Sequence, residues 1–124
     1  MTKTMTIDDL LKALRASDSA CYDLDRAISE FTGTWRLDGQ HEQHRAPLSY
    51  TFNVGDALGV LPDDVWWLMA KGRIEPGEPL YGIQLFPADD YAAEDDDALA
   101  EAEHECLPYC ILIAAFELRK ARQQ

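Results

Sequence analysis

Five side chains of the kinds that bind metal ions fall into two groups along the chain. His41 and His44 form the first group, and His104, Cys106 and Cys110 follow each other with the spacing H-x-C-x-x-x-C. Zinc prefers histidine nitrogens and cysteine thiolates, and a structural zinc site needs about four of them in a tetrahedral arrangement. One hypothesis is therefore a small metal- or ligand-binding protein that would use His41, His44, His104 and Cys106 together with nearby carboxylates.

The surroundings of these residues favour a simpler interpretation. His41 and His44 lie in a polar stretch without a clear period, which is typical of a loop. Pro108 separates the two cysteines, and Cys110 lies in an apolar run where cysteine commonly acts as a small buried hydrophobic residue. Burial would also raise the pKa of its thiol, which opposes a role as a nucleophile. We therefore expect no metal, no cofactor and no catalytic residue.

The most distinctive charged feature is an acidic segment at residues 87–106. It holds nine of the 23 acids of the chain and no Lys or Arg, and the chain as a whole has a net charge of −12. Its acids do not follow the spacing of an EF-hand loop, and no glycine stands at the sharp turn that such a loop needs. The sequence therefore does not indicate a calcium site here.

This charge distribution indicates which kind of partner to expect. Direct binding to nucleic acid needs clustered Lys and Arg against the phosphates, and the net charge of −12 argues against it, so we expect no direct contact with nucleic acid. A dense group of carboxylates instead steers association with a basic protein surface, although it can also serve solubility alone. The residues that we expect to contact a basic surface of a host or phage protein are Asp89, Asp90, Glu94, Asp95, Asp96, Asp97, Glu101 and Glu103.

The longest apolar run, residues 107–122, predicts the helix that organises the rest of the chain. Pro108 suits a first helical turn, and every residue from 109 to 116 is apolar, which is typical of a helix that is covered on most sides. Arg119, Lys120 and Arg122 suit the negative end of the helix dipole. The run is shorter than the roughly 20 apolar residues of a membrane span. We therefore expect a central helix on a sheet and no membrane contact.

Two further helices are expected near the N-terminus. Apolar residues at helical spacing predict the first one to about Arg15, with Thr6 as its N-cap. The second should begin at the break 17–19 and end near Gly33, with Asp25 among its outward-facing residues. After a loop at 33–49 that holds a short strand around Trp35, a third and shorter helix is expected from Val54 to Leu61.

The sheet is expected to come mainly from the middle of the chain. Residues 49–52 are β-prone, and residues 65–70 read as a strand that is buried on both sides because no position is polar. A turn should open at Lys71-Gly72, and residues 79–86 should form the antiparallel partner. Residues 98–105 have the composition of a helix and predict a solvated helical lead-in to the last helix. Trp66 and Trp67 should face opposite sides of the strand. We expect both to be covered, and the alternative is that one of them is a protein-contact anchor on an open face.

Together these features predict an α+β fold in one domain, residues 1–124, with a small, mainly antiparallel sheet packed with helices and a central C-terminal helix. The segment 87–106 would be an acidic loop and helical lead-in within it. The three cysteines are an odd number, and the N-terminus has no apolar signal region, so we expect reduced thiols in a cytoplasm.

The order of several short motifs resembles the phage ABA sandwich domain proteins, which are small proteins of tailed phages and prophages. In those proteins a helix with a Leu-Asp-x-Ala-Ile-like motif precedes a Tyr-Thr stretch, a Trp-containing strand and a final helix that opens with Pro. The matching residues are Leu24 to Ile28, Tyr50-Thr51, Ala57 to Pro62, Trp66-Trp67, Pro108 and Ile113 to Phe116. The first helix and the acidic segment depart from this pattern.

The resemblance implies an origin and an architecture but no activity. With the acidic segment, it leads us to expect a non-enzymatic phage or prophage accessory protein in the bacterial cytoplasm that acts by protein–protein contact. An inhibitor of a host nucleic-acid-targeting defence system, in the manner of an anti-CRISPR protein, is one such role. A virion assembly component is an alternative to it, as is the metal- or ligand-binding protein above, and the chain itself could form a homodimer.

Overall fold

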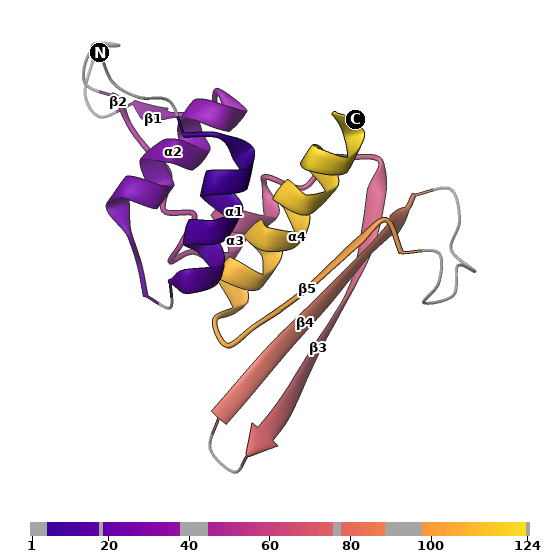
Figure 1. Ribbon diagram of the computed structural model, residues 1–124. Coiled ribbons are helices and arrows are strands. Elements are labelled where there is room, and N and C mark those ends of the chain that lie inside the picture. Colours follow the sequence, from indigo (N-terminus) through magenta and orange to yellow (C-terminus); the bar gives the residue numbers. More distant parts are fainter. Residues whose placement is uncertain (1–4, 18, 38–44, 76–77, 89–97, 124) are drawn as a thin grey trace.

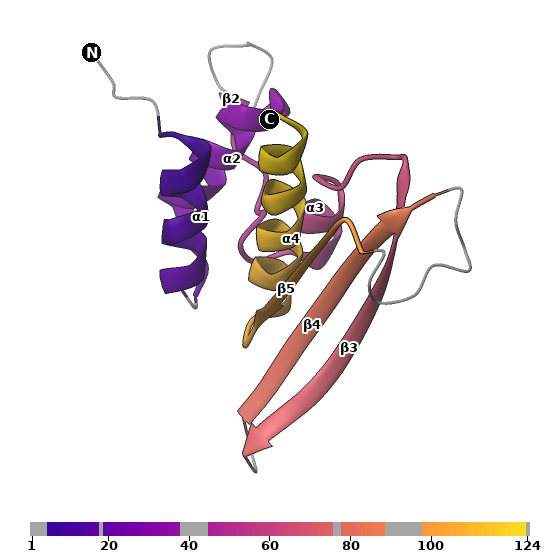
Figure 2. The same ribbon diagram turned by 45° about the vertical axis from the view of Figure 1, so that its right-hand side comes forward.

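Helices cover one face of a three-stranded antiparallel sheet, whose strand order is β3-β4-β5 (Figures 1 and 2). The computed structural model describes residues 5–17, 19–37, 45–75, 78–88 and 98–123. This is the α+β fold that the sequence predicts. The elements are α1 (Ile7–Ala16), α2 (Tyr22–Thr32), β1 (Arg36–Leu37), β2 (Arg45–Ala46), α3 (Val54–Leu58), β3 (Val65–Glu75), β4 (Glu78–Pro87), β5 (Ala100–His104) and α4 (Leu107–Arg122).

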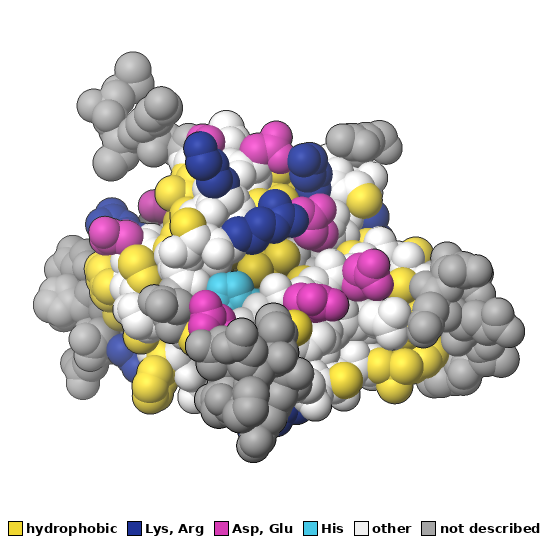
Figure 3. Space-filling view, turned by 60° about the horizontal axis from the view of Figure 1, so that its bottom comes forward, with side chains coloured by type: hydrophobic (Ala, Val, Ile, Leu, Met, Phe, Trp, Pro, Cys, Tyr) yellow, Lys and Arg dark blue, Asp and Glu magenta, His cyan; other side chains and the backbone are white. Residues whose placement is uncertain are grey.

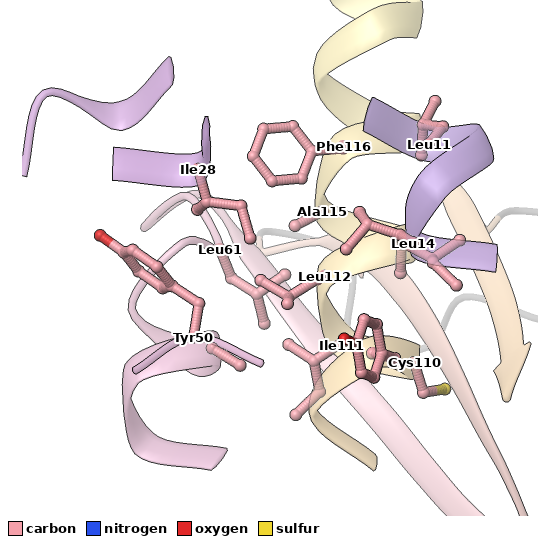
Figure 4. Close-up of a cluster of buried hydrophobic side chains, with 14 of the residues drawn as sticks. Leu11, Leu14, Ile28, Tyr50, Leu61, Cys110, Ile111, Leu112, Ala115 and Phe116 are labelled. Carbon is pink, nitrogen blue, oxygen red and sulfur yellow. The ribbon is translucent and has the colours of Figure 1, made fainter. Parts of the chain in front are cut away.

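Helix α4 lies between the sheet and the other helices, as the apolar run predicts, and its bounds agree with the expected ones. It packs against β5 and β4 on one side and against α1 and α3 on the other. All residues from Tyr109 to Phe116 are buried, and Figure 4 shows Cys110, Ile111, Leu112, Ala115 and Phe116 among the core side chains. The rings of Phe116 and Phe31 form a T-shaped contact with centroids 5.7 Å apart. The core of the domain is therefore built around this helix.

The basic residues at the end of α4 bind other elements of the fold. Arg122 donates two hydrogen bonds to the carboxylate of Asp64, at 3.1 and 3.0 Å, and Lys120 pairs with Asp8 at 2.6 Å. Arg119 donates to the carbonyl of Phe31 at 2.8 Å. Exposed ion pairs of this kind contribute little stability each. Each of these three cations nevertheless has a partner within the fold, so the end of the helix is not a free basic patch.

Both expected N-terminal helices are present. Thr6 caps α1, since its hydroxyl accepts a hydrogen bond from the amide of Asp9, and Gly33 ends α2 at φ +73°. The start of α2 was predicted wrongly: its N-cap is Cys21, which makes no side-chain capping bond, rather than a residue of the serine-rich break.

Replacing Gly33 by Ala should lower the free energy of unfolding by about 1–2 kcal/mol. Nothing lies within 4 Å of the position of the added Cβ, so the cost comes from the left-handed backbone alone. Chemical denaturation of Gly33→Ala and of Gly72→Ala, where φ is not in that region and the Cβ also meets nothing, measures it. Equal losses in the two variants would contradict this account.

Residues 49–52, expected as a strand, form a turn instead. The amide of Ser49 donates to the carboxylate of Asp56 at 3.0 Å, and the amide of Thr51 donates to that of Asp25 at 2.7 Å. Because carboxylates accept these hydrogen bonds, this backbone has no need of a neighbouring strand. The short pair β1–β2 occupies the region where a strand near Trp35 was expected, and α3 ends at Leu58, earlier than predicted.

The central hairpin is longer than predicted. Strand β3 continues through Lys71 and Gly72, where a turn was expected, as far as Glu75. It pairs with β4 in a regular antiparallel register from Val65, opposite Pro87, to Arg73. The antiparallel partnership itself is confirmed. The local pattern Lys71-Gly72 did not distinguish a turn from a strand, since glycine can also occupy an irregular or closely approached strand position.

Strand β3 is not buried on both faces, which corrects a second expectation. Among the described strands it lies at one edge of the sheet, and α4 packs on β4 and β5. Trp67 is 39% exposed, Leu68 52% and Met69 41%. Trp66 is half-buried and stacks on Phe86, with ring centroids 4.5 Å apart. An apolar run therefore marked a strand correctly but did not reveal its place in the sheet.

Residues 100–104 form strand β5 and not the predicted helical lead-in. Ala100, Ala102 and His104 alternate with two glutamates, so the segment has the period of a strand with one covered face. Pairing with β4 and packing against α4 outweigh its helical composition. Leu99 precedes the strand and is partly exposed.

Candidate functional site

The register of the sheet assigns each strand residue to one of two faces. The ring of His104 stacks on that of Tyr109 of α4, with centroids 5.1 Å apart. His104 and the β4 residue opposite it, Tyr81, therefore lie on the helix-covered face. Side chains alternate along a strand. The outer face therefore holds two rows of opposed residues, Leu68–Gln84–Glu101 and Ala70–Gly82–Glu103.

The β5 side of this outer face is an acidic hollow. Gln84, Glu101, Ala102 and Glu103 line a shallow cavity of about 360 Å³ on the sheet. Both glutamates are exposed, and no ion pair between described residues involves either of them. Two carboxylates and one amide oxygen can accept hydrogen bonds from a guanidinium or ammonium group. We define this set of four residues as the acidic hollow.

The cations of the described part of the chain lie mostly on the helical side. Arg15 pairs with Glu117, and Arg26 pairs with Glu30 at 3.8 Å. Figure 3 shows Lys and Arg side chains concentrated over the upper part of the view, next to acidic ones. Three acids of the helices, Asp8, Glu30 and Glu117, are thus paired with cations, whereas Glu101 and Glu103 of β5 have no such pair among the described residues.

The β3 side of the outer face is apolar. Leu68 lies across β4 from the hollow, in the same row as Glu101, and the stacked rings of Trp66 and Phe86 lie in the next row. The outer face therefore combines an apolar half with an acidic half.

Two of the eight predicted contact residues, Glu101 and Glu103, belong to the hollow. Residues 89, 90 and 94–97, the other six, lie outside the described residues. Gln84 was not named from the sequence. Its place depends on the β4–β5 register, and no local pattern encodes that register.

The described part of the chain contains no group of side chains that would support the metal-binding alternative. There, no three His, Cys, Asp or Glu side chains come close enough together to hold an ion. His41 and His44 lie outside the described residues. The Nδ1 of His104 accepts a hydrogen bond from the amide of Cys106 at 2.9 Å, so this nitrogen already has a donor.

Cys110 is buried beneath the sheet. Its thiol donates towards the carbonyls of Tyr81 and Ala102, both at 3.4 Å. Burial raises its pKa to about 11, so the thiolate is scarce at neutral pH. This agrees with the expectation that Cys110 is a packing residue.

None of the helices in the described part of the chain has the length and hydrophobicity to cross a bilayer. Comparison with known protein families, curated proteins and solved structures finds no match to this chain.

Proposed function

We propose that this chain is a non-enzymatic accessory protein that binds a basic surface of a partner protein through the outer face of its sheet. The observation that carries the proposal is the acidic hollow, in which Glu101 and Glu103 are exposed and lack a cation among the described residues. An arginine or lysine of the partner would enter between the two carboxylates. The apolar side chains across β4 would supply the hydrophobic part of the contact.

The acidic segment extends this proposal along the sequence. Six further carboxylates lie at residues 89–97, between β4 and β5. Opposite charges on two partners accelerate their association and exclude wrong partners more than they add affinity. We therefore assign the segment to steering and the hollow to the contact itself.

The resemblance to phage ABA sandwich domain proteins supports a phage or prophage origin. For such a protein, a host enzyme that targets nucleic acid is a suitable partner, because its substrate groove is lined with Lys and Arg. An acidic accessory protein that covers the groove would block access to the nucleic acid. We propose this inhibition of a host defence system as the role of the contact.

Neutralising the hollow should weaken binding to a basic partner. In the variant Glu101→Gln/Glu103→Gln, we expect affinity for an arginine-rich decapeptide to fall at least threefold, since charge-assisted hydrogen bonds become neutral ones. Titration calorimetry at two salt concentrations measures it, and the variant should also show a smaller loss of affinity with salt.

The matched control is Asp9→Asn/Asp23→Asn, which removes two exposed carboxylates from the first turns of α1 and α2. It changes the net charge by the same amount at a distance from the hollow. We expect its affinity to match that of the unmodified chain. Equal weakening in both double variants would mean that net charge alone, and not the hollow, attracts the peptide.

The steering role of the acidic segment has a separate test. Glu94, Asp95, Asp96 and Asp97 are exchanged together for Gln, and partners are captured from a bacterial lysate and identified by mass spectrometry. We expect a nucleic-acid-targeting enzyme that the unmodified chain retains and the variant loses. Unchanged capture would refute a role of these four acids in binding.

A further inference from the structure

The two edges of the sheet are protected to very different degrees. Strand β5 has five residues, and its outward positions are Glu101 and Glu103. Strand β3 has 11 residues, and its stretch at residues 65–70 contains no charge, proline or glycine. Proteins that stay monomeric usually guard their edge strands with short length, charge, proline or a bulge. By these criteria β5 is guarded, whereas the first half of β3 is not.

Apolar side chains are exposed on both faces of this edge strand. Trp67 and Met69 point to the face that carries α4 and are partly exposed there, whereas Leu68 points to the outer face. The register to β4 is regular from Val65 to Arg73, and the irregularity lies beyond Arg73. A neighbouring strand could therefore pair along this length and cover apolar side chains above and below.

We propose that β3 pairs with β3 of a second copy of this chain, in antiparallel orientation, to form a continuous six-stranded sheet. A two-fold axis through Leu68 sets Leu68 opposite Leu68 of the second copy on the outer face. On the other face it sets Trp67 opposite Met69 of the second copy, and this contact occurs twice. Sulfur–aromatic contacts of this kind are favourable, and each of these three exposed side chains becomes covered.

The charges on and near the strand favour this occupant and this register. Asp63 lies two residues before β3, and Lys71 lies within the strand, with its ammonium 5.9 Å from the centre of the Tyr81 ring. With the axis at Leu68, Asp63 of each copy lies diagonally across from Lys71 of the other copy, within reach of a long side chain. A parallel pairing in register would set Asp63 beside Asp63.

The oligomeric state tests this proposal directly. Analytical ultracentrifugation of the full chain, from low micromolar to millimolar concentration, should show a reversible monomer–dimer equilibrium. Leu68→Glu should weaken the dimer at least tenfold, because two carboxylates would then meet at the axis without a counter-charge. Leu68 is 52% exposed, so the monomer should tolerate the change, and circular dichroism checks that it does.

Phe52→Glu is the matched control, because Phe52 is 74% exposed and lies in the turn before α3. It should leave the dimer intact. As a second measurement, Leu68→Cys should form a disulfide between the two copies under mild oxidation, since directly opposed strand residues lie within disulfide distance. The unmodified chain, with its own three cysteines, controls for other links.

The proposal is overturned if the chain is monomeric at every concentration, if Leu68→Glu dimerises as well as the unmodified chain, or if the disulfides that form in Leu68→Cys do not join the substituted positions of the two copies. It does not depend on the acidic hollow. Both hollows would lie on the outer β5 strands of the six-stranded sheet, and Glu101→Gln/Glu103→Gln should leave the dimer unchanged.

Discussion

Phe116→Ala should lower the free energy of unfolding by about 3–5 kcal/mol, the usual cost of removing a fully buried aromatic side chain. Phe116 is completely buried at the centre of α4 and packs against the edge of Phe31. Neighbouring helices hold the surrounding atoms, so the cavity cannot easily collapse. A domain of this size has only about 5–15 kcal/mol of stability in total. The variant should therefore unfold at a much lower denaturant concentration.

Chemical denaturation followed by circular dichroism measures this effect, and Phe52→Ala is its control. The same side chain is removed there, but from a position that is 74% exposed, so the change should stay within about 0.5 kcal/mol. If the two variants lost similar stability, Phe116 would not be part of the core and α4 would not be the centre of the domain. The prediction thus tests the arrangement on which the rest of the fold depends.

The helices could be predicted because their signals are local. The apolar run of α4, the capping hydroxyl of Thr6 and the glycine that ends α2 each lie within a few residues of the feature they determine. The length of the β3–β4 hairpin and the strand character of β5 could not be predicted in the same way. Both depend on pairing between residues far apart in the sequence, and such pairing can outweigh local propensity.

The candidate site shows the same division. Glu101 and Glu103 were named because a run of acids without a cation is visible in the sequence. Gln84 and Leu68 were not named, because only the register of β3, β4 and β5 places them in the same row as Glu101. The exposure of Trp67 was likewise missed. Whether an apolar strand is central or lies at an edge is decided by where the chain places its neighbours.

Asp25 was also predicted wrongly, and the error concerns one of the resemblance motifs. It was expected to face solvent, but it is buried, and its carboxylate accepts a hydrogen bond from the amide of Thr51 at 2.7 Å. The hydroxyl of Thr51 in turn accepts one from the amide of Cys21 at 2.8 Å. The motif at residues 24–28 and the Tyr50-Thr51 motif therefore touch each other.

Asp25→Ala should accordingly lower the free energy of unfolding by about 1–3 kcal/mol, because the amide of Thr51 would stay buried without an acceptor. Asp25→Asn keeps an oxygen that can accept this hydrogen bond and has nearly the same shape. It should therefore retain most of the stability at pH 7. Chemical denaturation of both variants beside the unmodified chain separates the loss of the acceptor from the loss of the charge.

The pH dependence of the same variants tests the cost of burying this carboxylate. Burial raises the pKa of Asp25 above its ordinary value of 3.8, more than the hydrogen bonds from Thr51 lower it. A raised pKa in the folded state means that protonated Asp25 stabilises the fold. That contribution is fully present below pH 3.8 and is lost as the pH rises through the raised pKa.

Asp25→Asn cannot titrate at this position, so it lacks this loss. From about pH 4 upward, the free energy of unfolding of the unmodified chain should therefore fall relative to that of Asp25→Asn, until the carboxyl group is fully ionised. Using the difference between the two proteins removes the contribution of the other acids, which they share. A difference that moved the other way, with the unmodified chain gaining on the variant as pH rises, would mean that the hydrogen bonds from Thr51 outweigh desolvation.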